Sequence, residues 1–225
     1  MRNNKTALVL IDLQKESNFG LINMDSVVTH TKKIIEAARE QEIPIIYTRQ
    51  INRQDGVGLS LGEPLNEDGT PYFYHNGTEN VEIIDEIAPE KGDIIVDKYS
   101  WRACFETELD LMRKSLGVTD LLIGGVVTDG CVMTSVYDAY FRDYRVHLIE
   151  EACTASNEGS HQAAVLNMAN WVYNLKIYNT DNMVKKIQGE NHNYWSSNNV
   201  DSKQYTADTL NEQIEIIQQT AKGEF

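Results

Sequence analysis

The stretch DLLIGGVVTDGCVMTSVYDAYF, residues 120–141, decides the fold class of this chain. It begins with an apolar run, which favours a buried strand. From residue 130 onward, apolar residues recur at helical spacing, which predicts a helix over 130–143. Cys131 therefore lies where a strand turns into a helix. Both a small buried hydrophobe and a nucleophile suit such a position.

The same alternation of apolar runs and helical patterns extends in both directions along the sequence. Strands are predicted at 6–12, 43–48, 92–98, 120–126, 144–151 and 175–180, and helices at 24–41, 104–117, 130–143 and 159–172. Strands that alternate with helices favour a parallel sheet covered on both faces, so the sequence predicts an α/β fold. Residues 49–78 are rich in Gly, Asn, Asp and Pro and predict a long loop.

The composition limits the classes of partner. The chain has 225 residues, three cysteines and a formal net charge of −14. No apolar run approaches the ~20 residues that span a bilayer, and the N-terminus lacks the layout of a signal peptide. The cysteine spacing does not suit a disulfide framework, so we expect a cytoplasmic protein. The negative charge disfavours nucleic acids and anionic membranes as partners, and leaves a small molecule open as substrate.

Several polar residues follow the predicted strands directly, at the edge where parallel sheets bind ligands. These residues are Asp12, Thr48, Arg49, Lys98 and the turn from Thr128 to Cys131. A cysteine at a helix N-terminus has its thiolate stabilised by the helix dipole, and a nearby ammonium lowers the thiol pKa further. A carboxylate can accept the thiol proton, and backbone N–H groups can hold an oxyanion. Together these groups suit nucleophilic catalysis.

Three blocks of the sequence resemble the isochorismatase-like cysteine hydrolases, over about residues 7–181. The first block, LVLIDLQ, contains Asp12. The second, DKYSWRACFETEL, has Lys98, Phe105, Thr107 and Leu109 at the family's positions. The third, GVVTDGCV, matches every fixed position of Gly-Val-x-Thr-x-x-Cys-Val. Three blocks in this order, on the expected elements, make the resemblance specific.

The resemblance implies a fold and a site. The fold is a three-layer α/β/α sandwich with a six-stranded parallel sheet. The site is a catalytic triad of Asp12, Lys98 and Cys131, with a cis peptide bond between Val126 and Val127. The resemblance further implies that the backbone N–H groups of Val127 and Cys131 form the oxyanion hole.

The chain also departs from the family pattern. Where the family often has Ser-Ala-Phe after the lysine block, this chain has Arg102, Ala103 and Cys104. The nicotinamidase branch carries an Asp-x-His metal motif after the second strand, but YTRQINRQDG contains no histidine. We therefore expect neither a metal nor another cofactor. The isochorismate-cleaving branch usually lacks the nucleophilic cysteine, so Cys131 favours hydrolysis of an amide, ureide or carbamoyl compound through a thioester.

Two other functions stay open at this stage: vinyl-ether cleavage of the isochorismatase type, and a non-catalytic binding role on the same fold. The residues expected to bind substrate are Phe19, Tyr99, Trp101, Arg102 and Val126. The aromatic residues among them could instead simply pack, and Arg102 could either pair with a substrate carboxylate or lie free on the surface.

The C-terminal segment follows the part of the chain that resembles the family. We predict a hydrolase domain over 1–189, then a polar linker and an amphipathic helix over 206–221 within 190–225. Leu210, Ile214 and Ile217 form one apolar stripe, which a short helix must bury. Because the resemblance implies a homo-oligomer, we expect the stripe to pack on a neighbouring subunit. Docking onto its own domain is the alternative.

Overall fold

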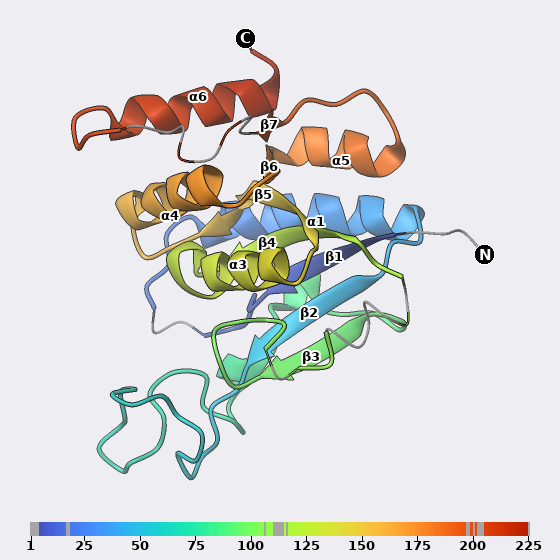
Figure 1. Ribbon diagram of the computed structural model, residues 1–225. Helices are drawn as coiled ribbons and strands as arrows, with labels where there is room; N and C mark the ends of the chain where they lie inside the picture. Colours follow the sequence, from blue (N-terminus) through green and yellow to red (C-terminus); the bar gives the residue numbers. More distant parts are fainter. Residues whose placement is uncertain are drawn as a thin grey trace.

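A computed structural model of the chain describes residues 5–16, 19–105, 107–109, 115, 117–196, 199, 201 and 205–224. A single seven-stranded sheet crosses the molecule in the order β3-β2-β1-β4-β5-β6-β7, from the bottom to the top of Figure 1. The strands are β1 (Thr6–Ile11), β2 (Ile45–Gln50), β3 (Ile94–Lys98), β4 (Asp120–Val126), β5 (Arg145–Thr154), β6 (Lys176–Tyr178) and β7 (Trp195–Ser196). The first six are parallel, and β7 pairs with β6 in the antiparallel direction.

Helices cover both faces of this sheet. They are α1 (Met24–Glu40), α3 (Met133–Phe141), α4 (Glu158–Trp171), α5 (Thr180–Gln188) and α6 (Leu210–Lys222), with short 3-10 turns η1 (Glu79–Val81) and η2 (Asp85–Ile87) and a π-helical turn η3 (Thr128–Val132). Within the described part of the chain, no helix is both long enough and apolar enough to cross a membrane.

The side chains of β1 show why this sheet needs two helical layers. Ala7, Val9 and Ile11 lie in the core shared with α3, α4 and α6. Leu8 and Leu10, which alternate with them, lie in the core shared with α1 and α5. Successive residues of a strand point to opposite faces, so an unbroken apolar run must be covered on both sides. The predicted three-layer α/β/α fold is confirmed.

Gly125 allows β1 and β4 to approach closely just before the π-helical turn. It lies opposite Ile11 in the parallel ladder and has a positive φ of 133°. A Cβ atom at this position would overlap the carbonyl oxygen of Ile11. Glycine is therefore required here both by its backbone conformation and by the space available.

Besides the short turns η1 and η2, the structure adds a strand and a helix that the sequence did not predict. The strand β7 has only two residues, too short to show a periodicity. The helix α5 does carry end signals: the Asn179 side chain accepts a hydrogen bond from the Asn182 N–H, and Gly189 ends the helix in the left-handed conformation. Half of the predicted helix over 104–117 lies outside the described residues.

The apolar stripe of α6 packs on its own chain, which was the alternative to docking on a neighbouring subunit. Ile214 and Ile217 are buried in the core of their own chain, together with Trp195 of β7. The Asn182 side chain also donates a 2.9 Å hydrogen bond to the Ala221 carbonyl. Burying the stripe within the chain avoids the entropy lost when two molecules associate. Homo-oligomerisation itself stays a prediction.

The contribution of α6 to this core can be measured. We expect Ile217→Ala to lower the free energy of unfolding by about 2–5 kcal/mol, because it leaves a cavity at a fully buried site. The neighbouring Ile216, which is only half-buried, provides the matched control. Urea unfolding of both variants checks this expectation. Equal losses at the two positions would show that α6 is not docked as described.

Candidate active site

Asp12, Lys98 and Cys131 come together at the carboxyl edge of the sheet. Asp12 follows β1, Lys98 ends β3, and Cys131 lies in η3, which follows β4. The Lys98 Nζ is 2.7 Å from the Asp12 Oδ2, and neither side chain is exposed to solvent. Both charged groups lie within hydrogen-bonding reach of the Cys131 thiol. The three residues therefore form one contiguous cluster of a thiol, a carboxylate and an ammonium group.

Two residues of β2 orient this cluster. The Thr48 hydroxyl donates a 2.7 Å hydrogen bond to the Asp12 Oδ1 and accepts one from the Asp12 backbone N–H. The Lys98 ammonium donates to the Gln50 Oε1 at 3.0 Å and to the Ser100 carbonyl at 3.1 Å. The sequence predicted that Thr48 ends this strand, but it lies within β2, which continues to Gln50. Gln50 was missed, because the predicted strand stopped short of it.

Gln14, the glutamine of the LVLIDLQ block, fixes Gln50 in turn. Its side-chain amide donates to the carbonyls of Gln50 and Val81, at 3.0 and 2.9 Å. Its Oε1 accepts a 2.8 Å hydrogen bond from the Gln50 N–H. Since each buried amide group has a partner, Gln14 ties β1, β2 and the η1 region together beneath the cluster.

The turn that carries Cys131 is also tightly held. The peptide bond between Val126 and Val127 is cis. The Val127 carbonyl accepts hydrogen bonds from the N–H groups of Gly130 and Val132, at 3.0 and 3.1 Å. Together with the helical backbone of η3, these bonds fix the position from which the Cys131 side chain projects.

A chain of hydrogen bonds connects this turn to the C-terminal helix. The Thr128 hydroxyl lies 2.9 Å from the His161 Nδ1, and the His161 Nε2 lies 3.1 Å from the Glu150 Oε1. The same Glu150 oxygen accepts a 2.9 Å hydrogen bond from the Gln218 side chain. His161 thus bridges structural elements. Through it, α6 supports the turn that carries Cys131.

The pKa of the Cys131 thiol differs from the expectation based on the sequence. Burial raises the pKa of Cys131 to about 12, with Asp12 adding to the increase and Lys98 opposing it. The sequence predicted a net lowering, because it revealed the ammonium but not the depth of burial. For Lys98, burial acts to lower the pKa, but Asp12 and Cys131 outweigh it, so the pKa is raised. Burial therefore favours the neutral form of the Cys131 thiol, which lies beside the Asp12–Lys98 ion pair.

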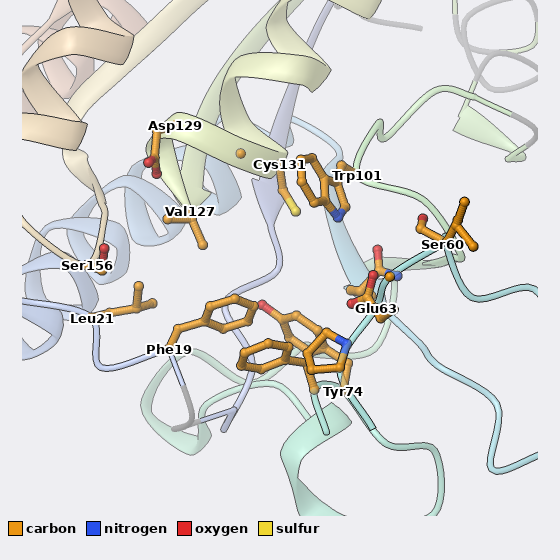
Figure 2. Close-up of a pocket in the computed structure, with 16 residues that line it drawn as sticks. Phe19, Leu21, Ser60, Glu63, Tyr74, Trp101, Val127, Asp129, Cys131 and Ser156 are labelled. Carbon is orange, nitrogen blue, oxygen red and sulfur yellow. The ribbon is translucent and has the colours of Figure 1, made fainter. Parts of the chain in front are cut away.

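The Cys131 side chain projects into a cavity of about 660 Å³ (Figure 2). Opposite the sulfur, Phe19 and Tyr74 form an aromatic wall, and Trp101 flanks the cysteine. Phe73 also lines the cavity and extends this wall by stacking on Phe19. Val127 also lines the cavity. The loop between β2 and η1, which projects beyond the sheet in Figure 1, contributes Phe73, Tyr74 and a stretch from Ser60 to Pro64.

The structure brings only some of the predicted substrate-binding residues to this cavity. Phe19 and Trp101 line it. Val126 does not, because its side chain is buried in the core beneath α1. Tyr99 is 58 % exposed and lies off the cavity wall, and the Arg102 guanidinium stacks on the Phe105 ring at 3.8 Å. The positions of Val126, Tyr99 and Arg102 therefore do not support the prediction that these residues bind substrate.

The donor atoms present do not suit a metal ion. Among the described residues, no group of three or more His, Cys, Asp or Glu side chains is arranged to hold a metal. The five histidines are scattered along the sequence, and His161 is occupied by Thr128 and Glu150.

Residues 6–176 match the Isochorismatase domain family. A ureidoacrylate amidohydrolase, RutB, from Rhizobium rhizogenes is 25 % identical to this chain over 181 residues, which cover 68 % of the chain and 71 % of the relative. A protein named "Probable inactive nicotinamidase" from Arabidopsis thaliana is 30 % identical over 175 residues, which cover 73 % and 88 % of the two chains.

Solved structures show the same architecture. A cysteine hydrolase from Pseudomonas syringae pv. phaseolicola superposes with a TM-score of 0.73 at 23 % identity, over 84 % of this chain and 95 % of the other. An N-carbamoylsarcosine amidase from Thermoplasma acidophilum gives a TM-score of 0.64 at 24 % identity, over 79 % and 97 %. At this identity the likeness establishes a shared fold.

Proposed function

This chain belongs to the isochorismatase family, and we propose that it is a cysteine hydrolase that cleaves a C–N bond in a small amide, ureide or carbamoyl compound. Amidohydrolases among its relatives support hydrolysis of C–N bonds other than peptide bonds. The observation that carries the proposal is the Asp12–Lys98 ion pair, fully buried and in contact with a thiol that opens onto a cavity. Burying two charges is costly, and a purely structural site would have no need of them beside a cysteine.

The first half of the reaction forms a thioester. Because burial favours the neutral thiol, attack requires a proton acceptor in contact with it, and Asp12 meets that requirement. As Asp12 takes the proton, the Cys131 sulfur forms a bond to the substrate carbonyl carbon, and Lys98 offsets the negative charge. The backbone N–H groups of Val127 and Cys131, both on the cavity wall, hold the oxyanion.

The second half releases the products. The tetrahedral intermediate collapses, the C–N bond breaks, and Asp12 returns its proton to the leaving nitrogen, which departs as ammonia or an amine. Asp12 then takes a proton from water, whose oxygen attacks the thioester carbonyl. The C–S bond breaks, Cys131 recovers its proton, and the free acid leaves. These steps require no cofactor.

A screen for ammonia release over small amides, ureides and carbamoyl amino acids tests this proposal, with Cys131→Ala as the control. Release that depends on Cys131 supports the proposal. If the wild-type protein instead cleaves a vinyl ether and the cysteine is dispensable, the chain performs isochorismatase-type chemistry. If it releases nothing from any of these compounds, the non-catalytic alternative gains support.

We expect chelation to leave this activity unchanged. The described residues offer no cluster of metal-binding side chains, and the proposed steps use only Asp12, Lys98, Cys131 and backbone groups. Activity measured before and after prolonged dialysis against EDTA checks this expectation. Loss of activity that zinc, manganese or iron restores would contradict it.

A further inference from the structure

We propose that the substrate carries a positive charge, such as an ammonium or guanidinium group, at the end remote from the carbonyl that Cys131 attacks. This inference rests on the proposed function and narrows its substrate class. It follows from the chemistry of the cavity wall that faces the sulfur.

The aromatic wall offers a surface suited to a cation. The rings of Phe19 and Phe73 are stacked, with centroids 4.1 Å apart and planes within 7° of parallel. Tyr74 lies against them, with a centroid distance of 5.5 Å from Phe19. In Figure 2 Phe19 and Tyr74 lie across the cavity from Cys131, and Trp101 flanks it. Aromatic faces carry partial negative charge and attract cations that lie over them.

The charged residues that line the cavity are all acidic. Glu63 and Asp129 both line the cavity, on opposite sides of it in Figure 2, and the described lining residues include no lysine, arginine or histidine. The basic residues nearby are engaged elsewhere. Lys98 pairs with Asp12, and Arg53 pairs with Asp55. A substrate carboxylate would therefore meet like charge with no cation to offset it.

Glu63 is the residue best placed to recognise the cation. It is half-buried in a stretch of loop that is otherwise mostly exposed, and its backbone N–H donates a 3.1 Å hydrogen bond to the Ser60 carbonyl. Its carboxylate has no hydrogen bond or ion pair with any described residue. A partly desolvated carboxylate beside aromatic rings attracts a cation more strongly than an exposed one does. The net charge of −14 also favours the approach of cations.

The base of the loop is fixed, so this wall exists before substrate binds. The buried Glu16 carboxylate accepts a 2.7 Å hydrogen bond from the Tyr74 N–H. The Asn52 side chain donates to the Phe73 carbonyl at 2.9 Å. Ile51, Tyr74 and Val81 form a small apolar core on which Phe19 and Phe73 pack. Because the side chains of this wall are already ordered, little of the binding free energy is lost in ordering them when substrate binds.

Three amides of similar size test the charge preference: 4-aminobutanamide, pentanamide and succinamate, which are cationic, neutral and anionic. Their affinities are measured by calorimetry on the Cys131→Ala variant, so the readout does not depend on turnover. We expect 4-aminobutanamide to bind at least about 10-fold more tightly than succinamate at low salt, with pentanamide between them. Equal affinities, a preference for succinamate, or no measurable binding of any of the three would overturn the proposal.

Glu63→Gln, made in the same background, locates the effect. We expect the preference for 4-aminobutanamide over succinamate to fall about 5- to 10-fold, because the charge is removed and the shape is kept. Glu67→Gln, in the exposed part of the same loop and off the cavity wall, is the matched control and should leave the preference unchanged. Equal effects of the two substitutions would assign the preference to the general field of the protein and overturn the role of Glu63.

The two proposals can fail separately. If the wild-type protein releases no ammonia in the screen of amides, ureides and carbamoyl amino acids but the variant binds the three amides in the expected order, the charge preference stands and the proposed reaction fails. If the wild-type protein hydrolyses succinamate best, the proposed reaction stands and the charge preference fails.

Discussion

Cys131→Ala is expected to reduce hydrolysis by at least about 10,000-fold in kcat while the protein remains folded. The substitution removes the atom that would form the thioester, and the Asp12–Lys98 ion pair beside it has no other nucleophile to activate. It removes a single sulfur atom at the edge of a cavity, so little packing is lost. Steady-state ammonia release measures the loss, and circular dichroism confirms the fold.

Cys153→Ala is the matched control for this experiment. Cys153 is also a buried free cysteine, but its sulfur lies 3.3 Å from the Ile149 carbonyl within β5 and does not line the cavity. We expect this variant to retain turnover close to that of the wild-type protein. A Cys131→Ala protein that kept comparable turnover would exclude the thioester mechanism.

Lys98→Met is expected to lower the free energy of unfolding by about 3–5 kcal/mol, in addition to abolishing activity. Lys98 and Asp12 are both fully buried, so removal of the ammonium leaves the Asp12 carboxylate without its compensating charge. The double variant Asp12→Asn, Lys98→Met removes both charges, and we expect it to regain much of that stability. Urea unfolding at neutral pH gives all three free energies.

The exposed pair Lys15–Asp85 provides the control for burial. Its atoms are also 2.7 Å apart, but the two side chains are 32 % and 82 % exposed. Solvent screens this pair, so Lys15→Met should change stability far less than Lys98→Met. If the double variant were no more stable than Lys98→Met, the cost at Lys98 would come from lost packing and not from an unpaired charge.

The sequence was sufficient for the parts of this protein that depend on local pattern. The alternation of apolar runs with helical spacing predicted the parallel sheet and its two helical layers, because β1, β2, β4, β5 and β6 bury residues on both faces. The GVVTDGCV block located the turn that carries Cys131. Because the carboxyl ends of parallel strands share one edge, the ends of the predicted strands were also enough to bring Asp12, Lys98 and Cys131 together.

The seventh strand and the packing of α6 needed the tertiary structure. The apolar stripe of Leu210, Ile214 and Ile217 predicts that this helix face is buried, but periodicity cannot say against what. The answer depended on the path of the chain after α5, which adds β7 to the edge of β6 and lays α6 against its own core.

The cavity wall likewise depended on contacts between residues far apart in the sequence. Gln14 meets Gln50 across 36 positions, and Glu16 meets Tyr74 across 58. These hydrogen bonds bring the loop that carries Glu63 to the sheet edge, and no local pattern encodes them. The pKa of the Cys131 thiol likewise depended on the tertiary structure. The sequence showed which charges surround Cys131, but burial has the largest influence on that pKa, and burial is a property of the folded chain as a whole.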